Sequence, residues 1–236
     1  MIGGTPADIE DYPSMAYLFV EKAAGYDYRG GAAIIGMYWA ITAAHCLIFI
    51  PDFLIKSKSA FIGSNTSYWE NNFVKHQIIK KYVHAQFNKK ELDFDIGLVK
   101  VHNPFDGIYE KPIKLAVVNY GYNEATAALA LGWGTTDPLA YSVVSRLRLA
   151  EVKLKNFKIC QENYAKVGDL VTNTMICAGA PGKDACVYDS GGPLYQNDVL
   201  IGLISWGSGK CGHRDLPSVY TKLSMFNQWI KSNLEK

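Results

Sequence analysis

Residues 184–194 read DACVYDSGGPL, a segment that places Ser190 inside a glycine-rich turn, behind an acidic residue and a cysteine. A nucleophilic serine needs such a turn, because the backbone around it must come close to the reacting group. One letter departs from this pattern: Tyr188 adds a large side chain two residues before the serine. The segment predicts a nucleophile turn with one obstructing residue.

Two other segments hold residues that could work with Ser190. His45 lies near the end of ITAAHC (41–46), and Asp95 lies at the entry to the strand-like DFDIGLV (93–99). Taken alone, a histidine beside a cysteine is more often structural, and aspartates at strand entries are common caps. Taken together, the three supply a nucleophile, a base and a carboxylate that orients the base.

The totals restrict the class of protein. The chain has 236 residues and is 49% hydrophobic, enough for one large domain or two small ones. Its net charge is +2, and it has no basic stripe, so we expect no nucleic-acid partner. No apolar run reaches transmembrane length, so we expect a soluble protein without a membrane partner. We also expect a monomer. The opening MIGGTPADIE is not a signal peptide.

The apolar pattern is mostly short and period-two, which is typical of β-strands. Strands are predicted at 32–44, 94–102, 128–134, 199–207 and 217–223. Many short strands indicate an all-β barrel or sandwich. The last segment, SMFNQWIKSNLEK, predicts an amphipathic helix that is capped by Ser224 and packs on the second half of the chain. Its apolar face comprises Phe226, Trp229, Ile230 and Leu234. Turn signals at 107–121 suggest a boundary between two barrels.

The five cysteines do not have the spacing of a metal site. The last four form an even set, and two disulfides among them would suggest an extracellular protein. Asn65 begins the glycosylation pattern Asn-Thr-Ser, which fits secretion. The region 67–73 has a single acidic residue, Glu70, so no calcium site is expected.

Along its whole length the chain resembles the chymotrypsin/trypsin-like serine protease family. The motifs that carry the resemblance occur in the family's order: IGG, WAITAAHC, DIGLVK, GWG, MICAG, the segment around Ser190, SWGSG and PSVYTKL. The resemblance implies an all-β fold of two antiparallel six-stranded β-barrels with a C-terminal α-helix. It places one barrel in residues 1–112 and the other in 113–236, implies a catalytic cleft between them, and implies no cofactor.

The resemblance also implies residue roles. The base, the orienting carboxylate and the nucleophile would be His45, Asp95 and Ser190. Ser205 would support Asp95, and Asp189 would bind the buried amine of Met1, which stands where active members usually have isoleucine. The substrate pocket would have Asp184 at its floor, selecting Arg or Lys, with Gly207 as its open wall. Ser218 in place of the usual glycine, and Lys210 beside Cys211, would narrow the pocket or neutralise Asp184.

The cysteines match only part of the family's disulfide pattern. The resemblance implies the pairs Cys160–Cys177 and Cys186–Cys211, each worth roughly 3 kcal/mol. The usual partner of Cys46 is replaced by Arg29, so Cys46 is expected to be a free, buried thiol. A further bridge is missing at both of its ends, Ala128 and Gln196. This loss also resembles the digestive trypsin-like proteases of mites.

Tyr188 decides between activity and inactivity, because its side chain either blocks the oxyanion hole or swings into solvent and leaves the hole intact. In the family this position is a glycine whose N–H, with that of Ser190, forms the oxyanion hole, and losing one donor costs on the order of 10²–10³ in turnover. With Ser218 and Lys210, Tyr188 makes three departures in one site. Tyr195 could stack nearby, although a tyrosine at such a position is more often a core residue. The chain thus most resembles the inactivated serine protease paralogues of the scabies mite. That resemblance implies a secreted, non-cleaving gut protein that binds host complement components.

Three hypotheses therefore stand. The first is a non-catalytic binding protein that uses a protease scaffold. The second is an active endopeptidase that cleaves after Arg or Lys. The third is a binder that uses an unrelated surface, with a vestigial cleft. Hydrolysis of a small arginine ester separates the first two.

Overall fold

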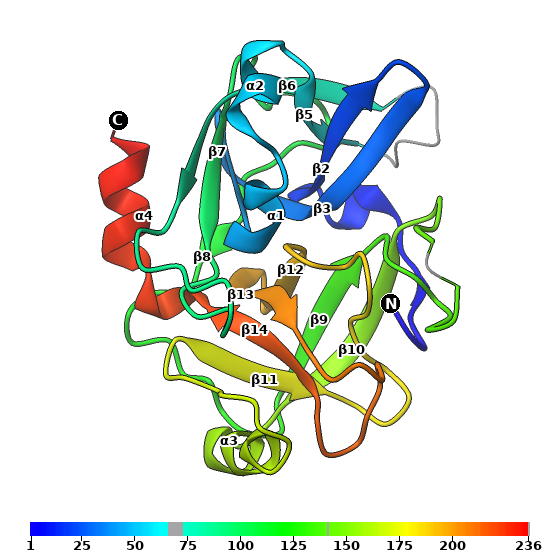
Figure 1. The fold of residues 1–236 in the computed structure, drawn as a ribbon, viewed down its shortest axis with the longest axis vertical. Helices are drawn as coiled ribbons and strands as arrows, with labels where there is room; N and C mark the ends of the chain where they lie inside the picture. The colour runs from blue at the N-terminus through cyan, green and yellow to red at the C-terminus, as the bar shows by residue number, and fades with distance from the viewer. Residues whose placement is uncertain (66–72, 141, 236) are drawn as a thin grey trace.

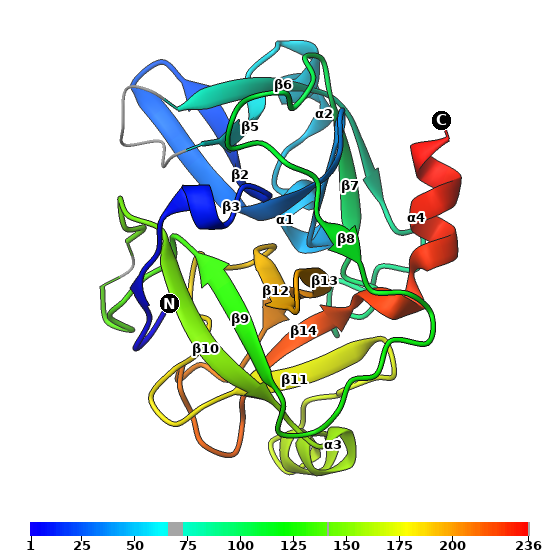
Figure 2. The same ribbon diagram turned by 180° about the vertical axis from the view of Figure 1, so that it is seen from behind.

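The structure, a computed structural model, describes residues 1–65, 73–140 and 142–235. Figures 1 and 2 show two β-barrels lying against each other, with the helix α4 along one side. The first barrel closes in the order β2-β3-β4-β7-β6-β5. Its strands are Met15–Lys22, Gly25–Gly36, Trp39–Thr42, Gly97–Val101, Val74–Val83 and Ala60–Ser64.

The second barrel runs in the order β9-β10-β11-β14-β13-β12, and β12 pairs back onto β9. Its strands are Ala127–Gly132, Arg148–Leu154, Met175–Gly179, Ser218–Lys222, Val199–Trp206 and Pro193–Gln196. Two short strands extend this sheet: β1 (Thr5–Pro6) pairs with β10, and β8 (Lys114–Leu115) pairs with β13. Both barrels are antiparallel and six-stranded, which confirms the predicted fold class.

The helices are short and lie outside the barrels. They are α1 (Ala44–Ile48), α2 (Asp52–Lys56), α3 (Phe157–Ala165) and α4 (Asn227–Leu234), with 3-10 turns η1 (Ile9–Asp11) and η2 (Leu223–Met225). No helix of the described residues is long and apolar enough to cross a membrane.

The prediction of one strand over 32–44 is wrong. The segment is the end of β3, a turn at Met37 and Tyr38, the strand β4 and the first residue of α1. Ala32, Ala33 and Ile34 are all buried, so the apolar run continues through consecutive residues and does not mark where the chain reverses.

The C-terminal helix differs from its prediction in two ways. Ser224 lies inside the 3-10 turn η2, and the residue at the N-cap of α4 is Phe226. The helix also contacts both barrels: Trp229 packs on His84 of the first half, with ring centroids 5.1 Å apart, and Asn227 donates from Nδ2 to the Ala116 carbonyl. Its predicted apolar face is confirmed, because all four of its residues belong to or pack against one hydrophobic core.

Both predicted disulfides are present, and the fifth cysteine is free and buried. Cys160–Cys177 joins α3 to β11, and Cys186–Cys211 joins the segment before Ser190 to the loop after β13. Where the further bridge is missing, Gln196 donates from Nε2 to the Ala127 carbonyl at 2.6 Å. A hydrogen bond therefore ties β12 to β9 in place of a covalent link.

Two sequence predictions concern the segment that follows β5. Asn65 follows β5 with a left-handed backbone, φ 73°. The rest of its glycosylation pattern and Glu70 lie outside the described residues, so the glycosylation and the absence of calcium stay predictions.

Candidate active site

The first barrel supplies a histidine and an aspartate that contact each other at two points. His45 lies in α1 directly after β4, and Asp95 lies two residues before β7. His45 Nδ1 lies 2.7 Å from Asp95 Oδ2, and the His45 backbone N–H donates to Asp95 Oδ1 at 2.8 Å. The ring and the carboxylate are thus held in one orientation.

The second barrel completes the surroundings of Asp95. Ser205 of β13 donates from Oγ to Asp95 Oδ2 at 2.5 Å, which places it as the resemblance implied. Thr221 of β14 donates from Oγ1 to the Asp95 carbonyl at 2.6 Å, a contact that the sequence gave no reason to expect. Asp95 is 1% exposed, and Ser205 together with the two His45 contacts satisfies a carboxylate that would otherwise be costly to bury.

Ser190 lies in the turn before β12, where that turn meets the first barrel. The Gly31 N–H of β3 donates to the Ser190 carbonyl at 2.7 Å. A Cβ on Gly31 would lie 2.6 Å from Gly192 Cα, so only glycine allows the two backbones to approach this closely. The glycine pair 30–31 therefore fixes the position of the serine between the barrels.

Ser190, the third member of the constellation, makes no hydrogen bond to His45 or Asp95 in the described residues. No hydrogen bond links His45 Nε2 to Ser190 Oγ among the described residues. His45 Nε2 instead lies 3.6 Å from the sulfur of its neighbour Cys46. Burial lowers the pKa of His45, but Cys46 and Asp95 more than offset this and hold it well above its ordinary value.

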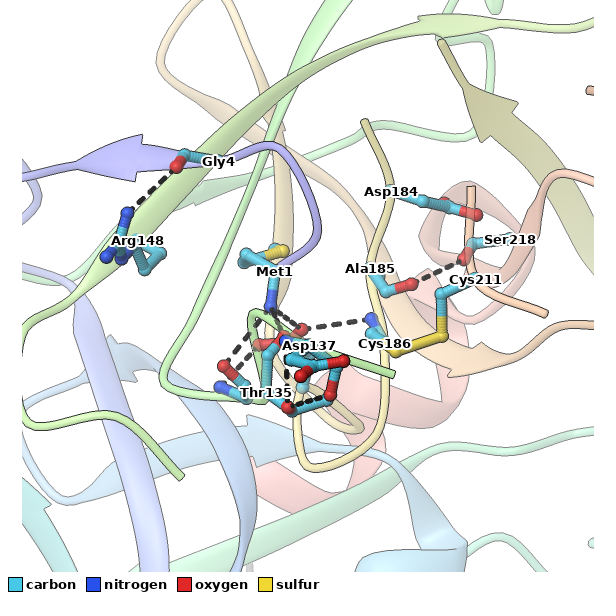
Figure 3. A network of polar contacts seen from close by, with 12 residues as sticks. Met1, Gly4, Thr135, Asp137, Arg148, Asp184, Ala185, Cys186, Cys211 and Ser218 are labelled. Atoms are coloured by element: carbon cyan, nitrogen blue, oxygen red, sulfur yellow. Dashed lines mark hydrogen bonds and ion pairs between the residues drawn. A yellow bond between two sulfur atoms is a disulfide. The ribbon is translucent and has the colours of Figure 1, made fainter. Parts of the chain in front are cut away.

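The chain's first residue is buried against the nucleophile turn. The Met1 ammonium lies 2.7 Å from Asp189 Oδ2 and also donates to the Gly134 and Thr135 carbonyls. Asp189 accepts the N–H of Gly134 and of Cys186 as well. The predicted contact between Met1 and Asp189 is present, and Figure 3 shows the Met1 amine among these loops.

Tyr188 adopts a left-handed backbone conformation, φ 71°. A residue with a Cβ pays roughly 1–2 kcal/mol there, a cost that glycine avoids. Its side chain is 37% exposed and makes no ring contact with the described aromatic residues. The N–H groups of Tyr188 and Ser190 have no acceptor in the described residues, so both are available to a ligand oxygen.

A cavity of about 300 Å³ opens beside Ser190. Asp184, Trp206, Gly207 and Ser218 are among the residues that line it, and Tyr188 is not. Asp184 is 3% exposed; its Oδ2 accepts the Gly212 N–H at 3.0 Å, whereas its Oδ1 has no hydrogen-bond partner in the described residues. Burial raises the pKa of this carboxyl, which the hydrogen bonds it accepts partly oppose.

The residues expected to obstruct the pocket lie elsewhere or only line it. Lys210 is exposed and makes no ion pair with Asp184 among the described residues. Ser218 lines the cavity, and its Oγ donates to the Ala185 carbonyl at 3.4 Å. Tyr195 is a core residue: its hydroxyl lies 2.8 Å from Ser14 Oγ and its ring stacks on Tyr12. The cavity beside Ser190 therefore remains open, although the sequence suggested that these residues would narrow it.

The arrangement can support acyl transfer if Ser190 reaches the histidine. The Nδ1 atom faces a carboxylate and so carries a proton, which leaves Nε2 as the basic atom for the serine hydroxyl. The N–H groups of Tyr188 and Ser190 would stabilise the resulting oxyanion. No cluster of three or more His, Cys, Asp or Glu side chains that could hold a metal ion occurs in the described part of the chain.

Sequence reasoning missed the contact between His45 and Cys46. The two residues are neighbours in the chain, so the sequence shows that they are close but not that the sulfur faces Nε2. The fact that Cys46 has no disulfide partner was the signal that could have raised the question.

The comparisons with known proteins agree with this geometry. The family model described as Trypsin matches residues 1–230. Hypodermin-B of Hypoderma lineatum is 33% identical, over 99% of this chain and 87% of its own length. Trypsin CFT-1 of Choristoneura fumiferana is 31% identical, over 99% and 90%. The solved structure of neuropsin, a serine protease of the mouse brain, has a TM-score of 0.85 at 29% identity and covers 99% of this chain and 100% of its own. The chain belongs to the trypsin family of serine proteases.

Proposed function

We propose that this protein is a secreted trypsin-like serine protease homologue that binds Arg- or Lys-bearing protein segments and cleaves them poorly or not at all. Its catalytic constellation would be His45, Asp95 and Ser190. The observation that carries the proposal is Tyr188, which holds a strained left-handed backbone at the position of an oxyanion donor.

Catalysis depends on donors that are fixed before the reaction begins. A residue with a Cβ relieves left-handed strain when it leaves that conformation, and this movement rotates its N–H away from the oxyanion. The exposed Tyr188 ring can also meet a substrate that approaches Ser190. Turnover is therefore expected to fall by at least about 10²-fold, the cost of one oxyanion donor.

Recognition of a basic side chain rests on Asp184. Its carboxylate is buried at the cavity, carries no ion pair among the described residues and has one oxygen without a partner. A guanidinium or ammonium group would supply both the missing charge and the missing donor. Binding of Arg or Lys can thus be retained while turnover is lost.

Secretion is supported by the two disulfides, which persist in oxidising compartments. The resemblance to the inactivated scabies mite paralogues extends the proposal to the gut lumen as the place of action and to host complement components as partners. This extension rests on the resemblance alone. A complement haemolysis assay tests it, with inhibition expected from the native protein but not from the heat-unfolded one.

The second candidate function is an active endopeptidase that cleaves after Arg or Lys. It is favoured by the Met1–Asp189 ion pair and by the unoccupied N–H groups of Tyr188 and Ser190. One experiment separates the two functions: benzamidine binding by calorimetry beside hydrolysis of a small arginine ester. Binding with turnover at least about 10²-fold below an active trypsin supports the first function, and turnover within about tenfold supports the second.

A further inference from the structure

The base of the constellation has an unexpected neighbour. Cys46 is 1% exposed and has no disulfide partner. Its sulfur lies 3.6 Å from His45 Nε2, which is the atom that a general base would use on Ser190. No hydrogen bond from Ser190 reaches that atom in the described residues.

The backbone of two glycines runs close to the sulfur. A Cβ on Gly30 would lie 2.7 Å from the Cys46 sulfur, and one on Gly191 would lie 3.2 Å from it. Both glycines have positive φ angles, 140° and 80°, which disfavour any side chain there. The contact between the thiol and the imidazole thus lies where β3 meets the nucleophile turn.

We propose that Cys46 is a positioning residue that competes with Ser190 for Nε2 of His45 and so suppresses its action as a general base. This inference deepens the proposed function and rests on it. It adds a second cause of low turnover, independent of Tyr188.

The competition holds in either protonation state of the pair. When the imidazole is neutral, the thiol can donate its S–H to Nε2. When the imidazole is charged, Nε2–H donates to the sulfur.

The other polar groups around the ring do not favour release of that proton. Asp95 faces Nδ1 and stabilises the imidazolium, and Ser205 and Thr221 act only on Asp95. The raised pKa of His45 agrees with a ring that is stabilised in its charged form from both sides.

The test is an NMR titration of the histidine ring protons in the whole protein, with Cys46→Ala and Cys46→Val as variants and Cys46→Ser as the conservative one. We expect the His45 midpoint to fall by about one pH unit or more in the first two and by less in Cys46→Ser, whose hydroxyl can still accept Nε2–H. His84 serves as an internal reference: burial lowers its pKa, it packs on Phe94 and Trp229, and its midpoint should not move.

Ester hydrolysis supplies the second readout. In Cys46→Ala and Cys46→Val we expect kcat to rise with KM unchanged, and the activity to begin at lower pH. An unchanged His45 midpoint in whichever of these variants folds would overturn the inference, as would a midpoint at or below that of His84 in the unsubstituted chain. The titration needs no activity, so its failure can be told apart from failure of the proposed function.

Discussion

Replacing Tyr188 by glycine tests the central claim about the oxyanion turn. Two effects should follow from the one change: relief of the left-handed backbone and, under the proposed function, recovery of an oxyanion donor. Relief of the left-handed conformation, φ 71°, is worth roughly 1–2 kcal/mol, although glycine also makes the unfolded chain more flexible, which returns part of it. A recovered oxyanion donor is worth about 3 kcal/mol, or roughly 10²-fold in kcat.

The assay is steady-state hydrolysis of a small arginine ester beside chemical denaturation of the same samples. We expect Tyr188→Gly to raise kcat by about 10²-fold with little change in KM, because the pocket over Asp184 is untouched. Ala125→Gly is the matched control: Ala125 also has a left-handed backbone, φ 61°, and lies in the loop before β9, outside the candidate site.

The control variant should show a similar change in the free energy of unfolding, because it relieves a similar left-handed strain, but no rise in kcat. The reasoning is refuted if Tyr188→Gly folds and matches the control in activity as well as in stability. In that case the oxyanion donors were already in place, and any low turnover measured for the unsubstituted protein would have to come from another group, such as the Cys46–His45 contact.

Three further changes address other parts of the molecule. Asp184→Asn should weaken benzamidine binding at least about 30-fold in calorimetry, because it removes one member of a buried charge pair; unchanged affinity would place the cation elsewhere. Acetylation of the Met1 amine should lower the free energy of unfolding by about 3 kcal/mol, since it leaves Asp189 as an uncompensated buried charge; denaturation curves that superpose would contradict this. Glu110 is buried against His76 at 2.7 Å, and although burial alone raises its pKa, the hydrogen bonds that it accepts lower the pKa below the ordinary value of 4.5. Its contribution to stability is therefore present above about pH 4.5 and lost as the pH falls through the lowered folded pKa, so the thermal midpoint should drop in acid, and Glu110→Gln should flatten that drop. A variant with the same acid dependence as the parent would show that another carboxyl is responsible.

The sequence predicted the parts of the fold that local patterns or whole motifs encode. Strands such as 199–207 alternate or run apolar between turn residues, and the structure places β13 there. The reversal at Met37 and Tyr38 was not predicted, because Gly36 is the single turn signal there and an isolated glycine in an apolar run also fits a continuous strand. Ser224 looked like a cap because its type favours caps, but the 3-10 turn η2 occupies that position.

In the site, residue identities could be predicted and distances could not. The motifs indicated which histidine, aspartate and serine should meet, and the Met1–Asp189 contact followed from the same resemblance. The direction of the Cys46 sulfur and the backbone conformation of Tyr188 depend on packing between segments far apart in the chain, such as Gly30 against the Ser190 carbonyl. The buried His76–Glu110 pair joins residues 34 positions apart that carry no motif.

Both ends of the chain cross to the opposite barrel. The start of the chain lies on the second barrel, where Met1 pairs with Asp189 and β1 pairs with β10. The end of the chain reaches back to the first barrel, where Phe226 and Trp229 pack on His84. Each barrel is thus contacted by a terminal segment that comes from the other half of the sequence.

The two terminal segments therefore connect the barrels independently of the chain segment that links them. A single protease cut in the exposed connection at Ile108, which is 81% exposed, would leave two fragments that still hold each other at both ends. The nicked protein should migrate as one species in a native gel and separate only in denaturant. The loss of this one peptide bond would therefore leave the cleft between the barrels in place.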